Sequence, residues 1–165
     1  MRRVRVLIPS IGHPTRPSLV EAMRQNGERT VEVIGADMDA DGIGPHVADE
    51  FCEVPPRTHP GYLDRVLEIC RTKQVDVYYA LGEEEAIGSS ERRSEFEALG
   101  VAVMTPGRAQ MLRISSNKAR YHEFLEARGL PYARFPAIAR LVDVEPAPRE
   151  MGFPDLADFL QTPAF

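Results

Sequence analysis

Short apolar runs that favour β-structure alternate with helix-like segments over the first hundred residues of this chain. The runs lie at residues 4–9, 31–36, 51–54, 75–80 and 101–104. Helix patterns with one apolar face or a clear stop signal lie between several of them, at residues 17–26, 61–73 and 84–99. Strands that alternate with helices form parallel sheets through right-handed crossovers, and runs this apolar are typical of strands covered on both faces. The pattern therefore predicts an α/β domain over residues 1–105.

Residues 106–165 have a different character. A short helix is expected at 108–113, and Ser115 or Ser116 can cap a second helix that ends before Gly129. From residue 146 onward four prolines, at positions 146, 148, 154 and 163, exclude a long central strand. We therefore expect a Rossmann-like doubly wound parallel sheet of about five strands. A small helical extension follows it, which we interpret as a linker and the truncated start of a further lobe.

Charge and composition exclude several functional classes. Twenty Lys and Arg against 25 Asp and Glu give a formal net charge of −5, and no dense basic run occurs, which argues against nucleic-acid binding. No apolar stretch approaches the length of a membrane span, and the amino end lacks a signal-peptide pattern. Cys52 and Cys70 have no CxxC spacing and are interpreted as buried free thiols rather than a disulfide. These features predict a cytoplasmic protein.

Ligands of open parallel sheets bind beyond the carboxyl ends of the strands, and four such positions carry candidates. The first is the loop after residues 4–9, with Ser10, Gly12 and His13 just before a helix. Backbone amides at a helix start bind anions, which is the functional interpretation. A plain turn with a solvated histidine is the alternative. The single Gly12 does not make a GxGxxG dinucleotide pattern, which argues against a NAD-dependent enzyme.

The second candidate is the acidic segment 37–42, which follows the run at 31–36. It reads Asp-Met-Asp-Ala-Asp-Gly, like the first half of a calcium loop. The twelfth position, where such a loop needs a bidentate Glu, is Ala48, and the segment follows a strand rather than a helix. We therefore predict instead that Asp37, at the tip of the strand, accepts hydrogen bonds from a polar ligand group. A solvated acidic loop is the alternative.

The third and fourth candidates lie in the first turns of two expected helices. Glu83, Glu84 and Glu85 suit the helix dipole, which alone accounts for them, but one of them can face the ligand crevice, and we assign Glu83. Lys118 opposes the dipole of its helix. A nucleotide phosphate beside that terminus would explain it, and a solvent-exposed lysine is the alternative. The four histidines are scattered without metal-ligand spacing, and no nucleophilic triad or P-loop pattern occurs.

Several stretches follow one another in an order typical of one enzyme family. They are residues 10–12, 33–39, 48–56, 62–64, 82–85, 96–101, 116–118, 124–125, 129–131 and 151–154. No single one is diagnostic, but their order and spacing together are specific. Over about residues 3–155, the chain resembles the N-terminal, preATP-grasp region of ATP-grasp ligases, in the branch similar to the carbamoyl-phosphate synthase large subunit.

This resemblance implies a Rossmann-like domain followed by two lobes that clamp ATP between them. Such an enzyme joins a carboxylate and an amine, or a similar pair, through an acylphosphate, with Mg²⁺ neutralising the phosphates. Lys118 matches the family's first nucleotide-binding lysine. Gly12, Asp37 and Glu83 match positions at which family members approach a small-molecule substrate, and Ser10 and His13 flank the same crevice.

The chain departs from the family pattern near its end. After residues 152–154 the family continues into a strand that ends in Lys-Pro, whereas Thr162 stands here in place of that lysine. The glycine-rich ATP loop and the Mg²⁺ ligands would lie beyond Phe165. We therefore expect a domain that is catalytically incomplete alone and does not bind ATP or Mg²⁺ tightly. It would work with a second chain carrying the lobes, or as a homo-oligomer. A stand-alone Rossmann-like binding module without catalysis is the alternative, and the substrate's identity stays open.

Overall fold

A five-stranded, all-parallel sheet forms the centre of the protein. The computed structural model describes residues 3–105 and 107–132. The strand order is β3-β2-β1-β4-β5, and each neighbouring pair is parallel. This confirms the predicted α/β, Rossmann-like fold. The strands are β1 (Val4–Pro9), β2 (Val31–Asp37), β3 (Glu50–Glu53), β4 (Val77–Tyr78) and β5 (Ala102–Val103).

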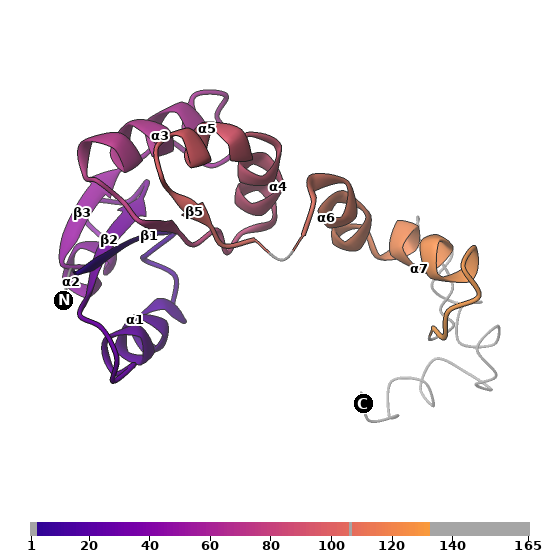
Figure 1. The fold of residues 1–165 in the computed structure, drawn as a ribbon, viewed down its shortest axis with the longest axis horizontal. Coiled ribbons are helices and arrows are strands. Elements are labelled where there is room, and N and C mark those ends of the chain that lie inside the picture. The colour runs from indigo at the N-terminus through magenta and orange to yellow at the C-terminus, as the bar shows by residue number, and fades with distance from the viewer. Residues whose placement is uncertain (1–2, 106, 133–165) are drawn as a thin grey trace. The chain divides into compact units, whose positions relative to one another are not determined.

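Helices cover the two faces of this sheet in separate layers. α1 and the short α2 lie on one face, and α3, α4 and α5 lie on the other (Figure 1). A sixth helix, α6, packs against α4, and a seventh, α7, follows it in the sequence. The helices are α1 (Arg16–Arg24), α2 (Gly44–Val47), α3 (Tyr62–Thr72), α4 (Glu83–Glu91), α5 (Arg93–Ala98), α6 (Ala109–Ser116) and α7 (Lys118–Glu126).

The alternation of side chains along β1 explains why helices are needed on both faces. Val6 and Ile8 point into the core beneath α1, where they join Val20. Leu7, between them, points into the core beneath α3, where it joins Val66. Because successive strand residues face opposite sides, a continuous apolar run such as this one buries both faces. Leu7 and Ile8 are fully buried as a result.

An ion-pair network closes the amino edge of the sheet. Arg5 on β1 donates to Glu32 on β2 and to Glu50 on β3, and Lys73 at the end of α3 donates to Glu50 as well. Arg3 adds a second contact to Glu32 at 2.7 Å. The network joins three strands and one helix at the amino ends of the strands. It therefore stabilises the end of the sheet opposite to the carboxyl ends, where ligands of such sheets bind.

The segment 84–99, predicted as one helix, is two helices in the structure. α4 ends at Glu91 and α5 begins at Arg93, because Arg92 leaves helical geometry with φ −99° and ψ 20°. The Arg92 guanidinium bonds Asp64 of α3 and Glu95 of α5. Phe96 of α5 is fully buried against Tyr78 of β4. No glycine or proline marks this break, so the sequence pattern does not show it.

The chain divides into two compact units, residues 1–116 and a second unit that starts at Asn117. The sheet, its helices and α6 belong to the first unit. Of the second unit, the structure describes residues 117–132, which hold α7. The predicted stop at Gly129 matches a left-handed residue with φ 61° just after this helix. No helix among the described residues is long and apolar enough to span a membrane.

Candidate functional site

A pocket of about 320 Å³ lies beyond the carboxyl ends of β1, β2 and β3. This is the edge at which open parallel sheets bind ligands. The ends of the strands, the loop after β3, and the first turns of α3 and α4 supply its walls. The lining residues are Ser10, Asp37, Met38, Val54, Pro55, Pro56, Arg57, Thr58, Tyr62 and Glu85.

The most unusual group in the pocket wall is the carboxylate of Glu85. It lies in the first turn of α4, yet only 1% of the residue is exposed. The Ser10 hydroxyl donates to Oε1 at 3.0 Å and the Tyr62 hydroxyl donates to the same oxygen at 3.2 Å. The backbone N–H of Gly82 donates to Oε2 at 2.8 Å, as the third residue of a helix often accepts from the N-cap. One carboxylate thus ties β1, α3 and the start of α4 together.

Gly82 is required by the close approach of this carboxylate. A Cβ built on Gly82 would lie 2.9 Å from Glu85 Oε2 and 3.1 Å from its Cδ. Such contacts are closer than real side chains show, so a larger residue here would push the carboxylate out of place. The absence of a side chain at the N-cap therefore helps to fix the geometry of Glu85.

Ser10 holds its hydroxyl on Glu85 from a strained backbone. Its φ is 50°, in the left-handed region that residues with a Cβ rarely adopt. Such residues gather at functional sites, where the surrounding contacts keep them in place. Here the contact is the hydrogen bond to Glu85 Oε1. The turn after β1 is therefore shaped around the pocket.

Two buried tyrosines lie behind the carboxylate. Burial and the nearby Glu85 raise the pKa of Tyr62 above its ordinary value, so its hydroxyl stays protonated and donates. Burial likewise raises the pKa of Tyr78, which is fully enclosed on β4. The Tyr78 hydroxyl interacts with the Tyr62 hydroxyl and with Glu85. The polar groups of the site therefore include two tyrosine hydroxyls within the core between the sheet and α3.

Asp37, predicted as a ligand-facing residue, does line the pocket at the end of β2. Its Oδ2 accepts the Gly12 N–H at 2.8 Å. Its Oδ1 accepts the N–H groups of Met38 at 2.8 Å and Asp39 at 3.3 Å. The carboxylate thus fastens the loop after β1 to the loop after β2, and one acceptor position remains on Oδ2. Gly12, also predicted, lies beside the pocket through this contact.

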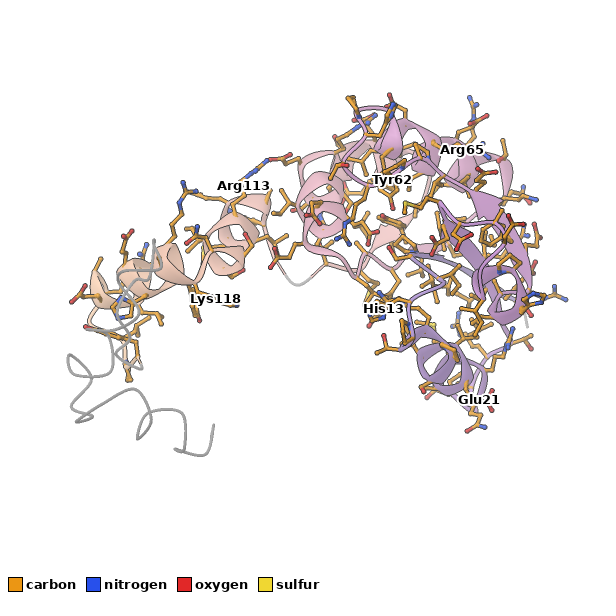
Figure 2. The ribbon with its side chains drawn as sticks, turned by 180° about the vertical axis from the view of Figure 1, so that it is seen from behind. His13, Glu21, Tyr62, Arg65, Arg113 and Lys118 are labelled. Carbon is orange, nitrogen blue, oxygen red and sulfur yellow. The ribbon has the colours of Figure 1, made fainter. Side chains whose placement is uncertain are left out.

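His13 and Glu83 lie outside the pocket lining. His13 is exposed in the loop before α1, and its Nδ1 lies 2.9 Å from the Thr15 hydroxyl. Figure 2 shows it on the other side of the sheet from Tyr62. Glu83 is exposed at the start of α4. The structure brings Ser10 and Asp37 together in the pocket wall, while ligand contacts of His13 and Glu83 stay predictions.

Lys118 belongs to the second unit, where it is the first residue of α7. The prediction that Ser115 or Ser116 caps this helix is wrong, because both hydroxyls bond carbonyls of α6. Asn117 is the cap, and its side-chain oxygen accepts the Arg120 N–H at 3.0 Å. Lys118 is exposed, and its contact with a nucleotide phosphate stays a prediction.

The polar groups and apolar walls of the pocket suit a small molecule. The one cation of the pocket lining, Arg57, is half exposed and faces Glu84, with Nε 3.3 Å from Oε2. Within residues 3–105 and 107–132, no three His, Cys, Asp or Glu side chains gather as a metal site. The acidic loop 37–42 instead uses its carboxylates on its own backbone, as in the bond from Asp41 N–H to Asp39 Oδ1.

Glu85 and Tyr62 are two pocket residues for which the sequence predicted no ligand role, because the crevice-facing glutamate of the run 83–85 was assigned as Glu83. Glu85 was one of three adjacent glutamates, all suited to the helix dipole. The third helical position after Gly82 was the available signal, because a glutamate there folds back to the N-cap N–H. The inward direction of its side chain, however, depends on Ser10 and Tyr62, which come from distant parts of the chain.

Comparison with solved structures finds the same fold in enzymes of much greater length. A biotin carboxylase subunit of pyruvate carboxylase is 17% identical, with a TM-score of 0.55, over 91% of this chain and 33% of that one. A glycinamide-RNase-transformylase T from Mycobacterium tuberculosis is 19% identical, with a TM-score of 0.56, over 87% and 37%. An ADP complex of PurK, N5-carboxyaminoimidazole ribonucleotide synthetase, is 17% identical, with a TM-score of 0.55, over 92% and 35%. The chain thus spans little more than a third of these proteins at most.

These likenesses show the fold, which resembles the N-terminal, preATP-grasp part of ATP-grasp ligases. A comparison with curated proteins finds no match. A comparison with protein families matches residues 6–104 to the PylC-like N-terminal domain. The matched stretch contains the sheet except for the first two residues of β1, and it contains every residue that lines the pocket. Because this match covers more than half of the chain, the protein belongs to the PylC-like N-terminal domain family.

Proposed function

We propose that the chain is the substrate-side domain of an ATP-grasp ligase, in the branch similar to the carbamoyl-phosphate synthase large subunit. The complete enzyme would join a carboxylate to an amine, or a similar pair, through an acylphosphate. The observation that carries the proposal is the family match over residues 6–104, which contains the pocket and all of the sheet except the first two residues of β1. Fold similarity supports it, because the fold occurs in the solved structures as part of larger ligases and carboxylases.

In this proposal the pocket holds the substrate. Its walls combine a buried carboxylate, hydroxyl groups and apolar side chains, a mixture typical of small-molecule sites. The site lies on a rigid sheet edge, and Glu85 fixes three elements around it. Positioning of one substrate is a large part of the work of a ligase, since correct orientation lowers the barrier to bond formation.

ATP and Mg²⁺ are proposed as cofactors of the complete enzyme. The described residues do not fit them alone, because they supply no cluster of metal-ligating side chains and a single proposed phosphate contact, Lys118. Thr162, which replaces the second lysine of the family pattern, lies outside the described residues. We therefore assign to this domain the binding of substrate rather than of phosphate, and we derive no phosphoryl-transfer step from it.

The lobes that clamp ATP would come from further chain or from a second, cytoplasmic polypeptide. One sheet face has room for such a neighbour. On the α1 side of β4 and β5, Val77 and Tyr79 are half-buried, while Ala102 and Met104 are exposed. Met104 exposes 52% of its surface. Exposed apolar side chains on a sheet face are typical of a contact with another domain.

Calorimetry with Mg·ATP tests whether this domain binds substrate while the ATP-grasp lobes bind ATP. The chain alone is expected to show no micromolar binding of Mg·ATP, and such binding would overturn the proposal.

When a polypeptide from the same genome that carries ATP-grasp lobes is added, ADP should form. Lys118→Gln should lower ADP formation by about tenfold or more, because it removes a charge that stabilises transferring phosphate. Arg120→Gln, an exposed cation on the same helix, is the matched control and should have little effect.

A stand-alone binding module is the second candidate. One observation favours it: every residue of the pocket comes from the first unit, so the site needs no other domain to form. The same reconstitution separates the two candidates. A chain that binds small molecules but neither associates with ATP-grasp lobes nor supports ADP formation would be a binding module.

A further inference from the structure

We propose that Glu85 selects the ligand of the pocket, and that the group it takes is a protonated amine carried on a small apolar body. This inference rests on the proposed function in so far as the pocket holds the substrate. It adds the chemical class of the group recognised and the side chain that recognises it.

The first step is the burial of a carboxylate without a counter-cation. Glu85 is 1% exposed, and no Lys, Arg or His of the described residues lies within ion-pair distance of it. Its three donors are the hydroxyls of Ser10 and Tyr62 and the N–H of Gly82, all of them neutral. A carboxylate removed from water is costly unless it is paired with opposite charge. Arg57 approaches the same N-cap, with Nη1 3.4 Å from where a Cβ of Gly82 would lie, but its ion pair is with Glu84. Among the described residues, Glu85 therefore has no direct ion-pair partner.

The second step is the acceptor capacity that remains. An ionised carboxylate offers about four lone-pair positions. Ser10 and Tyr62 occupy Oε1, whereas Oε2 accepts from Gly82 alone. One position on Oε2 is therefore left, and Glu85 is part of the pocket wall. A ligand donor that occupied this position would displace none of the three existing bonds.

The third step concerns charge in the pocket as a whole. Two carboxylates, Asp37 and Glu85, and one guanidinium, Arg57, line it, so the formal sum is −2 + 1 = −1. Arg57 is half exposed and already faces Glu84. The wall contains hydroxyl donors of its own, so a ligand hydroxyl would add nothing that the site lacks. A protonated amine supplies the missing charge, and a charge-assisted bond is about twice as strong as a neutral one.

The remaining walls define what carries the amine. Val54, Pro55, Pro56 and Met38 present apolar surface, and the pocket volume of about 320 Å³ is at the small end for ligand sites. A chain or ring of a few carbons would fill this space and shed water from the Glu85 contact. A large, highly charged group such as a nucleotide triphosphate would meet the two carboxylates and be repelled.

Nuclear magnetic resonance titration of the whole 165-residue chain tests the inference with three probes of equal size: n-butylammonium, n-butanol and butyrate, at constant ionic strength. The backbone signals of Ser10, Gly82 and Tyr62 report on the pocket. Butylammonium is expected to shift them at concentrations about tenfold lower than butanol, and butyrate is expected to leave them unchanged. Equal responses to ammonium and alcohol, a preference for butyrate, or no shift with any probe at about 100 mM would each overturn the proposal.

Glu85→Gln identifies the side chain responsible. The amide keeps the size of the side chain and an oxygen for the Gly82 N–H, and it should reduce the preference for ammonium over alcohol from about tenfold to near unity. Glu97→Gln, an exposed carboxylate of α5 outside the pocket lining, is the control and should retain the preference. An unchanged preference in Glu85→Gln would contradict the assignment. If that variant does not fold, the three-probe comparison on the unaltered chain still decides whether the pocket takes a cation.

Failure of this inference is distinguishable from failure of the proposed function. ADP formation with the ATP-grasp lobes depends on Lys118 and on those lobes, whereas probe binding depends on Glu85. A chain that supports ADP formation but does not favour the ammonium probe would keep the proposed function and refute the amine. The reverse result would keep the amine site and refute the ligase.

Discussion

At the scale of single residues, Ser10 joins backbone strain to pocket chemistry. Its left-handed conformation costs about 1–2 kcal/mol for a residue with a Cβ. The hydroxyl bond to Glu85 is large enough to offset this cost, since a bond to a charged group stabilises by about 1.5–3 kcal/mol. A glycine at this position would avoid the steric cost but would lose the hydroxyl bond.

Two substitutions at Ser10 separate these contributions. Ser10→Gly and Ser10→Ala both lose the hydroxyl, but only alanine keeps the steric cost of φ 50°. Ser10→Gly is therefore expected to have a free energy of unfolding about 1 kcal/mol above that of Ser10→Ala. Urea denaturation of the two variants measures the difference. An alanine variant as stable as the glycine variant would show that the turn relaxes away from the left-handed conformation.

The site residues that lie at the carboxyl end of a strand were predictable from the sequence. Ser10 and Asp37 follow β1 and β2 directly, and both line the pocket. Glu85 was not predictable, because the first helical turn tolerates a glutamate in any of its positions. Which carboxylate turns inward is decided by Tyr62, whose approach depends on the crossover through α3.

At the scale of elements, helix ends in this protein share one geometry. After α5, Gly100 has φ 75°, and the Val101 N–H donates to the Phe96 carbonyl at 3.0 Å. This is the Schellman arrangement, which favours glycine at the left-handed position. α3 ends in the same way, with the Val75 N–H on the Cys70 carbonyl at 3.0 Å, but Gln74 occupies the left-handed position at φ 52°.

Exchanging residues at these two ends should change stability in opposite directions. Gln74→Gly removes the steric cost of φ 52° and is expected to raise the free energy of unfolding by about 0.5–1 kcal/mol. Gly100→Ala introduces that cost and should lower the free energy of unfolding by about 1 kcal/mol, since no atom lies within 4 Å of the added Cβ to confuse the result. Thermal or urea unfolding of both variants provides the measurement. Changes of the same sign would contradict the explanation.

Most helices and strands were predicted from the sequence, because the spacing of apolar residues and the glycines that end helices are local patterns. All five predicted strands occur, although β4 and β5 are two residues long where runs of six and four were expected. The short α2 and the break at Arg92 were missed. Both depend on tertiary contacts, such as the bonds from Arg92 to Asp64 and Glu95, which no local pattern encodes.

At the scale of the whole molecule, the core should lose stability in alkaline solution. Burial raises the pKa of Cys70 from 9.0 to about 12, and it raises the pKa of Cys52, Tyr62 and Tyr78 as well. The unfolded chain releases these protons at lower pH than the folded chain does. The stabilising effect is therefore complete below about pH 9 and is lost as the pH rises toward about 12.

The free energy of unfolding should fall by up to about 1.4 kcal/mol per pH unit for each such group in this window. Urea denaturation between about pH 8 and pH 11 measures the slope. Cys70→Ala removes one titrating group and should make the slope shallower at little cost to packing. A free energy of unfolding that stays constant up to about pH 11 would show that these groups are not protected from water in the folded state.

The boundary of the first unit provides the last prediction, because sequence and structure place it differently. The sequence pattern ends the sheet domain at residue 105, whereas the compact unit continues to Ser116 and includes α6. Leu112 of α6 packs on the main core, and Arg113 forms an ion pair with Glu91 at 2.6 Å. A fragment of residues 1–105 should therefore be less stable than one of residues 1–116 by about 1 kcal/mol, because Leu112 is partly buried and gains only a fraction of the value of a fully buried leucine. Leu112→Ala in the longer fragment should reproduce most of this loss, and Arg113→Ala should reproduce little of it, because exposed ion pairs contribute less than about 1 kcal/mol. Equal stability of the two fragments in urea would make α6 an appendage of the sheet domain, and would move the structural boundary back to where the strand pattern ends.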